Sequence, residues 1–167
     1  MIKKLTVYSK LLEYPLDYKE FMCSCNLIGD LKLDFSKIKL SELQEEYVSI
    51  FDFNEKSTLY ISKHISKNDD ERKMFLLAMN EFLKLYGGKP NIKHSPDYLP
   101  TILSALYIAI NKKEYPEKLS YLTAMIERSV CDILNSFNER SSVYYKIVES
   151  LKYYLNDIQK ILEVKYA

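Results

Sequence analysis

The residue types that could do chemistry in this chain are few, and they do not form a catalytic pattern. His64 lies in a segment without clear periodicity. It could act as a general base only if a carboxylate oriented it and a substrate reached it. The acidic pairs Glu45-Glu46 and Asp69-Asp70 fall in first turns or on polar faces of expected helices, where the helix dipole accounts for them. We therefore predict that the protein is not an enzyme.

The sequence also lacks the usual signatures of metal and nucleotide sites. Cys23, Cys25 and Cys131, with His64 and His94 as the two histidines, do not have the spacing of a zinc site. The three glycines never form GxGxxG, GxxxxGK[ST] or GxSxG. Cys25 falls on an apolar helical face, so we expect it to be buried. We expect no metal and no cofactor to be bound.

The stretch SPDYLP, from Ser95 to Pro100, stands directly before the apolar run TILSALYIAI. If Asp97 is the N-cap of a helix, the next three residues are its first positions. Pro100 has no backbone N–H, and this costs nothing there, because an N–H in the first turn would have no acceptor within the helix. The carboxylate of Asp97 can then accept from the Leu99 N–H. This prediction leaves Tyr98 exposed on the first turn, where it is free to contact a ligand.

Composition and charge indicate one globular domain, residues 1–167, large enough to bury a full core. Lys and Arg number 24 and Asp and Glu 23, and this near balance supplies no field for gathering nucleic acid. The first residues, MIKKLTVYSKLLEYP, lack the continuous apolar stretch of a signal peptide or membrane span. We expect a cytoplasmic protein without membrane insertion.

Apolar residues recur at helical spacing through almost the whole chain, which predicts an all-α bundle. The start and stop signals are Pro15, Gly29, a capping box at Ser41 and Gln44, another at Asn68 and Glu71, Gly87, Pro116 and the Ser141-Ser142 pair. The helix that ends at Gly87 carries an apolar stripe of Met74, Leu77, Ala78, Phe82, Leu85 and Tyr86. Residues 52–67 break the pattern and suit a loop, a short extended piece or one irregular turn.

Between Gln44 and Leu103 the chain carries an ordered set of residues: YVxxFD at 47–52, then Ser57, Leu59, His64, Arg72, Ala78-Met79, Tyr86 and PDYLP at 96–100. In these residues the stretch from Gln44 to Leu103 resembles the NarJ-type assembly chaperones of respiratory nitrate reductase, within the TorD-like redox-enzyme maturation proteins. The chain departs from the family pattern at His94-Ser95, where the family usually has Glu-Leu.

The resemblance implies an all-helical, non-catalytic chaperone. Its partner would be the amino-terminal segment of a molybdenum oxidoreductase catalytic subunit, held until the bis-molybdopterin guanine dinucleotide cofactor is inserted. The client-binding residues that it implies are Tyr47, Phe51, Asp52, His64, Pro96, Asp97 and Tyr98. Tyr47 and Phe51 are four residues apart on one expected helix face, a spacing that also suits the core.

The function remains open between two classes at this point. In one, the chain is a maturation chaperone, for nitrate reductase or for another molybdoenzyme. In the other, it is a small helical adaptor or enzyme that shares only the architecture. We expect a monomer or a weak homodimer in either class.

Overall fold

The computed structural model describes residues 3–29, 31, 33–87 and 93–164. All regular elements in these ranges are helical, which confirms the prediction of an all-α fold. The α-helices are α1 Lys4–Leu11, α2 Tyr18–Ile28, α3 Leu40–Tyr47, α4 Ser62–Ile65, α5 Asp69–Tyr86, α6 Leu99–Lys112, α7 Pro116–Asn135 and α8 Val143–Val164. A 3-10 turn, η1 (Phe35–Lys37), precedes α3, and a π-helical turn, η2 (Val48–Asp52), continues it.

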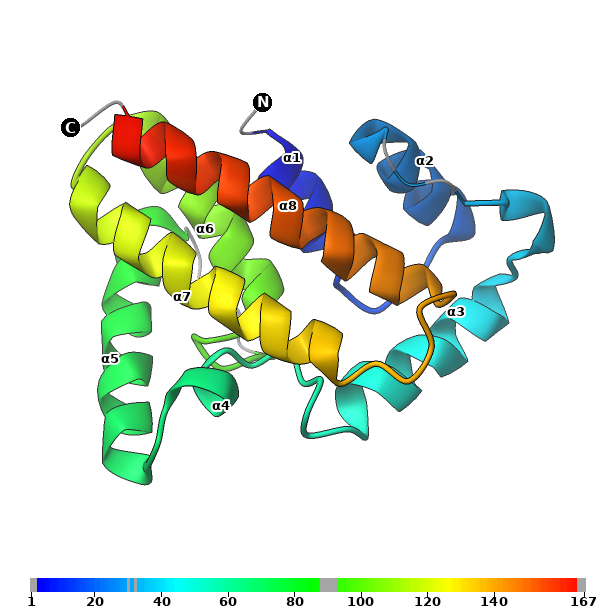
Figure 1. Ribbon diagram of the computed structural model, residues 1–167, viewed down its shortest axis with the longest axis horizontal. Helices are drawn as coiled ribbons and strands as arrows, with labels where there is room; N and C mark the ends of the chain where they lie inside the picture. The colour runs from blue at the N-terminus through cyan, green and yellow to red at the C-terminus, as the bar shows by residue number, and fades with distance from the viewer. Residues whose placement is uncertain (1–2, 30, 32, 88–92, 165–167) are drawn as a thin grey trace.

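The helices pack as two neighbouring pairs with smaller elements around them (Figure 1). α7 and α8 run side by side along most of their length, and α1 packs against α6. α2 and α3 lie toward one end of the molecule, whereas α5 stands at the other end and packs against α6 and α4. α6 therefore contacts its own partner α1, the α7–α8 pair through α7, and also α5.

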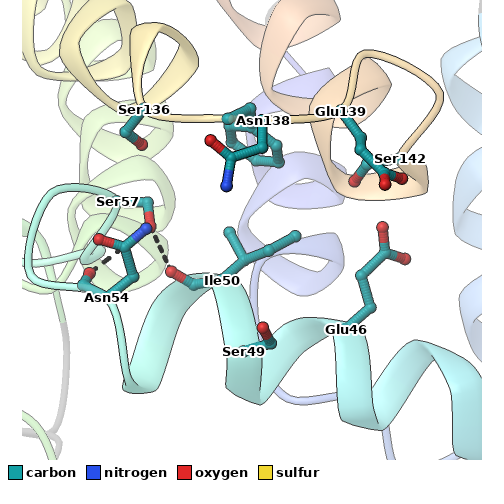
Figure 2. Close-up of a pocket in the computed structure, with 10 residues that line it drawn as sticks. Glu46, Ser49, Ile50, Asn54, Ser57, Ser136, Asn138, Glu139 and Ser142 are labelled. Atoms are coloured by element: carbon teal, nitrogen blue, oxygen red, sulfur yellow. Dashed lines mark hydrogen bonds between the residues drawn. The ribbon is translucent and has the colours of Figure 1, made fainter.

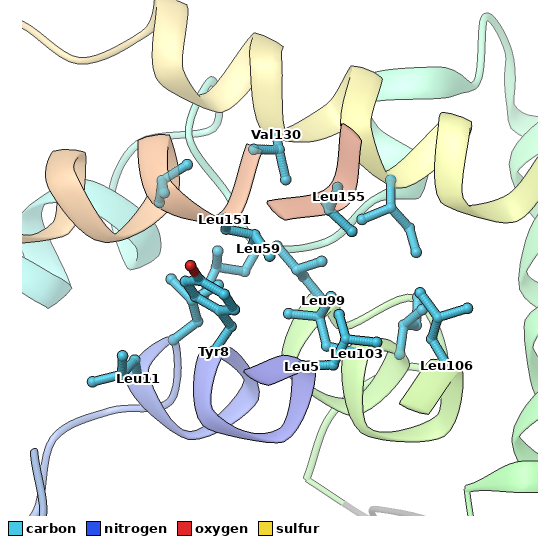
Figure 3. Close-up of a cluster of buried hydrophobic side chains, with 14 of the residues drawn as sticks. Leu5, Tyr8, Leu11, Leu59, Leu99, Leu103, Leu106, Val130, Leu151 and Leu155 are labelled. Carbon is cyan, nitrogen blue, oxygen red and sulfur yellow. The ribbon is translucent and has the colours of Figure 1, made fainter. Parts of the chain in front are cut away.

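The core lies where α1, α6, α7 and α8 meet (Figure 3). Its labelled members are Leu5, Tyr8 and Leu11 of α1, Leu99, Leu103 and Leu106 of α6, Val130 of α7, Leu151 and Leu155 of α8, and Leu59 from the segment before α4. Burying one such side chain contributes roughly 1.5–3 kcal/mol. The core is continuous through these helices, so α6 is covered on most of its surface.

Several helix boundaries follow the signals that the sequence carries. The Asn68 side chain accepts from the Glu71 N–H at 2.9 Å, and the Ser142 hydroxyl accepts from the Tyr145 N–H at 3.1 Å. Gly29 ends α2 with a φ of 82°, a left-handed conformation that glycine adopts without strain. These caps confirm the predicted starts of α5 and α8 and the end of α2.

The predicted capping box at Ser41 and Gln44 is wrong by two residues. α3 starts at Leu40, and the Glu42 carboxylate accepts from the Lys39 N–H at 3.3 Å. The Gln44 side-chain amide instead donates to the Pro15 carbonyl oxygen at 2.9 Å. Gln44, which the local pattern assigned to the helix cap, thus bonds to a residue 29 positions earlier in the chain.

Residues 52–67 combine the alternatives that the sequence left open. They contain the end of η2, a turn, an isolated bridge residue at Tyr60 and the short helix α4. In the ranges that the structure describes, no helix is both long enough and apolar enough to cross a membrane.

The side of α2 that faces the core can be tested through its two cysteines. Cys25 is 2% exposed, and burial raises the pKa of its thiol to about 12, whereas Cys23 is exposed. Because the thiolate is the reacting form, we expect iodoacetamide at pH 8 to modify Cys23 quickly and Cys25 only after unfolding. Peptide mass spectrometry of native and urea-treated protein measures both sites. Equal labelling rates in the native protein would mean that α2 does not bury Cys25.

Candidate functional site

Two irregular segments that are far apart in the sequence meet at the start of α6. The Leu99 N–H donates to the Leu59 carbonyl oxygen at 2.8 Å, and the Ile61 N–H donates to the Asp97 carbonyl oxygen at 3.0 Å. The two segments also form an isolated antiparallel bridge there. We call this contact between residues 59–62 and 95–99 the junction. It contains the middle of the PDYLP motif.

The side chain of Asp97 lies at the centre of the junction and is fully buried. One carboxylate oxygen accepts from the Ser62 N–H at 3.2 Å and from the Ser62 hydroxyl. The other accepts from the Ser95 hydroxyl. The Arg72 Nε–H donates to the Ser62 hydroxyl oxygen at 3.1 Å, which brings a guanidinium charge close to the carboxylate. A buried carboxylate needs such partners because it has lost its hydration.

The prediction that Asp97 caps the following helix is wrong. α6 begins at Leu99, its N-cap residue is Tyr98, and no side chain caps it. The Leu99 N–H bonds to Leu59 instead. The carboxylate turns toward Ser62, which lies 35 residues earlier in the chain. No pattern confined to SPDYLP contains that partner.

The prediction that Tyr98 is exposed is also wrong, because its side chain is 4% exposed. Its hydroxyl lies 3.0 Å from the Tyr47 hydroxyl, which in turn donates to the Leu12 carbonyl oxygen at 3.2 Å. The ring stacks on His94 with 3.9 Å between centroids. Burial raises the pKa of Tyr98 to about 12 and raises that of Tyr47 as well. Tyr98 therefore belongs to the interior that joins the end of α1, the end of α3 and the junction.

Tyr47 and Phe51 occupy the core position that their spacing also suited. Each is 4% exposed, and their ring centroids are 5.1 Å apart. Tyr144 of α8 meets both rings edge to face, at 5.6 Å and 5.4 Å. In this conformation neither Tyr47 nor Phe51 reaches the surface.

The other three residues implied by the resemblance lie nearer to solvent. Asp52 is exposed at the end of η2, and Pro96 is half-buried beside Asp97. His64 is half-buried in α4, where its Nε2–H donates to the Thr58 carbonyl oxygen at 2.8 Å. The structure brings His64, Pro96, Asp97 and Tyr98 to or beside the junction. Of the seven predicted client-binding residues, only Asp52 is exposed.

A groove that the sequence did not indicate runs between α5 and α7. Its volume is about 480 Å³. Its lining is apolar or aromatic apart from two charged side chains, Glu81 and Lys118. The apolar and aromatic lining residues are Phe75, Ala78, Met79, Phe82, Leu85 and Tyr86 from α5 and Tyr115, Leu119, Tyr121, Leu122 and Met125 from α7 and the residue before it. The exposed members include Leu85 at 66% and Tyr121 at 70%.

The apolar stripe expected on α5 is only partly buried. Met79 and Tyr86 face the core, whereas Met74 and Leu77 are 68% and 63% exposed. α5 carries more apolar residues than one packed face needs, and that excess is the signal that could have indicated an uncovered side. Uncovered apolar surface of this kind marks an interaction site more often than a stable free surface.

A second hollow, between the η2 turn and the α7–α8 connection, is polar (Figure 2). Glu46 points across it toward Glu139 and Ser142, and the Ser57 hydroxyl donates to the Ile50 carbonyl oxygen at its edge. Its volume is about 260 Å³. Its chemistry does not suit apolar side chains. In the described part of the chain, no group of three or more His, Cys, Asp and Glu residues is placed to hold a metal ion.

Comparison with known proteins identifies the family. A family model described as nitrate reductase delta subunit matches residues 22–145, which is most of the chain. The chain belongs to this family. The match includes the junction and α5, α6 and α7, and it confirms the resemblance seen in the sequence.

A curated relative points the same way. The probable nitrate reductase molybdenum cofactor assembly chaperone NarJ of Bacillus subtilis (strain 168) is 28% identical over 119 residues. These residues are 70% of this chain and 60% of the relative, so the match spans less than two thirds of the relative's length. A relative named as an assembly chaperone supports the prediction that this chain is not an enzyme.

The junction geometry predicts how stability responds to changes at Asp97. Asp97→Ala leaves the Ser62 N–H and the Ser62 and Ser95 hydroxyls without their acceptor, so we expect a loss of about 2–4 kcal/mol. Asp97→Asn keeps the shape but weakens charge-assisted bonds, so we expect a loss of about 1–2 kcal/mol. Urea unfolding followed by far-UV circular dichroism measures both.

Asp52→Asn is the matched control, because Asp52 is exposed, and we expect a change within about 0.5 kcal/mol. An N-cap at Asp97 would give a different pattern. Asn caps as well as Asp, so Asp97→Asn would be silent and Asp97→Ala would cost about 1 kcal/mol. That pattern would contradict the junction described above.

The buried tyrosine pair predicts a loss of stability at high pH. The pKa of Tyr98 is about 12 in the folded protein and about 10 in the unfolded chain, so above pH 10 the unfolded state loses its proton first. Stability is complete below pH 10, and we expect the unfolding free energy to fall by about 1.4 kcal/mol per pH unit for each such tyrosine between pH 10 and 12. Tyr98→Phe should make this slope shallower, and Tyr153→Phe, at a 65% exposed position, should not. Identical slopes in all three proteins would contradict the buried phenol.

Proposed function

We propose that this chain is an assembly chaperone for a molybdenum oxidoreductase. Its client is the amino-terminal segment of the catalytic subunit, which it holds in the cytoplasm while the molybdenum cofactor is inserted, and the enzyme that we name is nitrate reductase. The family match and the name of the Bacillus subtilis relative support the assembly role. The observation that carries client binding is the apolar groove between α5 and α7.

The dimensions of the groove suit a short amphipathic helix. Its lining runs from Phe75 to Tyr86 on α5 and from Tyr115 to Met125 on the α7 side. At about 1.5 Å per residue this is about 16 Å, or about three helical turns. Amphipathic helices dock in such grooves through apolar side chains spaced three to four residues apart. A client segment that forms a helix only when bound spends about 2–5 kcal/mol on ordering, so the groove must supply anchors that are already in place.

The chemistry of the groove favours apolar anchors over charged ones. Glu81 is engaged by Lys84 at 2.6 Å, and Lys118 lies over the ring of Tyr115. The favourable free energy of binding would therefore come mainly from burial of apolar surface, which contributes about 25 cal/mol per Å² removed from water. Exposed, rigid aromatic rings such as that of Tyr121 are the side chains that dominate small interfaces.

We propose an indirect role for most of the residues that the resemblance implied. Tyr47, Phe51, Asp97 and Tyr98 are buried, so their effect on a client would pass through the position of α5 and α6. Pro96 lies within the same junction, and His64 lies beside it. Asp52 is exposed and stays a candidate for direct contact. A cytoplasmic location and a monomeric or weakly dimeric state stay predictions.

The groove is tested with substitutions that place a charge in it without disturbing the core. Leu85→Glu puts a carboxylate on an exposed wall of the groove, so we expect a loss of at least tenfold in affinity, about 1.4 kcal/mol, with an unchanged melting temperature. The ligand is a synthetic peptide of the amino-terminal segment of the nitrate reductase catalytic subunit from the same genome. Isothermal titration calorimetry gives the affinity and the stoichiometry.

Leu27→Glu is the matched control, because Leu27 is also a leucine at 66% exposure but lies on α2, outside the groove. We expect its affinity to equal that of wild type. Binding that survives Leu85→Glu would exclude the groove as the client site. If the chain binds only the corresponding peptide of another molybdoenzyme, that enzyme and not nitrate reductase is the client. If it binds neither peptide, the chaperone function is wrong and the adaptor function takes its place.

A further inference from the structure

The connection between α6 and α7 has an unusual backbone. Lys113 and Tyr115 have φ values of 58° and 49°, in the left-handed region that residues other than glycine rarely adopt. Tyr115 also precedes Pro116, and the proline ring disfavours helical conformations at the residue before it. The backbone of Tyr115 therefore has a conformation that both its own Cβ and the ring of Pro116 disfavour. Conformations of this kind persist only where surrounding contacts maintain them, and they gather at functional sites.

Polar contacts to α5 and α7 hold this connection in place. The Tyr86 hydroxyl of α5 donates to the Glu114 carboxylate at 3.1 Å, and the Lys112 ammonium lies 5.1 Å from the centroid of the Tyr86 ring. On the other side, the Lys118 ammonium lies 4.8 Å from the centroid of the Tyr115 ring. Through these side-chain contacts the left-handed turn is linked both to the end of α5 and to the beginning of α7.

The turn places the ring of Tyr115 at one end of the groove. Tyr86 and Tyr115 are the lining residues nearest to that end, on the α5 side and the α7 side respectively. Tyr115 is 60% exposed, so its ring adds little to the folding core. A rigid ring at this place, with only two side-chain torsions to order, is suited to receive an apolar group from a partner.

We propose that Tyr115 is a specificity-determining residue of the groove. Its ring forms the end wall against which the terminal apolar or aromatic side chain of the client helix packs, and it thereby fixes the register of that helix. The Lys118 ammonium orients the ring by a cation–π contact. This inference rests on the proposed function, because it takes the client segment as the occupant of the groove.

The test separates the ring from the backbone that carries it. Tyr115→Gly removes the ring and also relieves the left-handed strain, so we expect an equal or slightly raised melting temperature, by up to about 4 °C. The affinity for the client peptide should fall at least tenfold. Tyr115→Asn, which also tolerates this conformation, should behave in the same way, and Tyr115→Phe should keep wild-type affinity because it keeps the ring.

A double-mutant cycle distinguishes a specific contact from a general loss of binding. The terminal apolar residue of the peptide is replaced by alanine, and both peptides are titrated into wild type and Tyr115→Gly. We expect the alanine peptide to bind wild type at least fivefold more weakly than the unchanged peptide does. In Tyr115→Gly the two peptides should bind equally, because the wall that discriminates between them is gone.

The outcomes bear separately on the two proposals. If Leu85→Glu abolishes binding but Tyr115→Gly binds like wild type, the groove stands and the role of Tyr115 is wrong. A uniform loss for both peptides without coupling also overturns it, since a register wall must discriminate between them. If wild type binds no client peptide at all, the proposed function fails, and the inference about Tyr115 fails with it.

Discussion

The arrangement of the helices depends on how two buried irregular segments satisfy their backbone groups. An unpaired buried N–H costs about 1–3 kcal/mol, and neither segment at the junction is long enough to form a sheet that would supply acceptors. The N–H groups of Ile61 and Leu99 therefore take carbonyl oxygens across the junction, and the Ser62 N–H takes the Asp97 carboxylate. Because the Leu99 N–H is the first of α6, these bonds determine where α6 begins.

The position of α6 determines in turn which surfaces remain open. α6 packs against α1, α5 and α7, so its own apolar residues are covered on several sides. α5 packs against α6 and buries Met79 and Tyr86, whereas its contacts with α7 are few. The α5 residues Phe75, Ala78, Phe82 and Leu85 then border the space beside α7, and together with Met79 and Tyr86 they form the α5 wall of the groove. An amphipathic helix with a second apolar side is stable in this place only because α6 covers the first.

The sequence predicts local features of this structure well and long-range ones poorly. The helical period and caps such as Asn68 and Ser142 act within one turn, so the starts of α5 and α8 follow from neighbouring residues. Asp97 had the spacing of an N-cap, but a carboxylate takes whichever donors the fold brings to it, and these came from Ser62 and Ser95. The groove could not be located because α5 and α7 are separated by the whole of α6, and periodicity does not specify which helix covers which face.

α5 is held by polar contacts at both of its ends. Near its start, Arg72 donates to Ser62 and so joins the helix to the junction, and at its end Tyr86 donates to Glu114 in the connection that leads to α7. Between these points the helix presents side chains such as Leu85 to solvent. If the groove binds the client segment as proposed, a wall that is fixed at its ends would lose little conformational entropy on binding, and the cost of ordering would fall mainly on the client. The buried junction and the left-handed turn before α7 thus hold the two ends of α5, the helix that forms one wall of the groove.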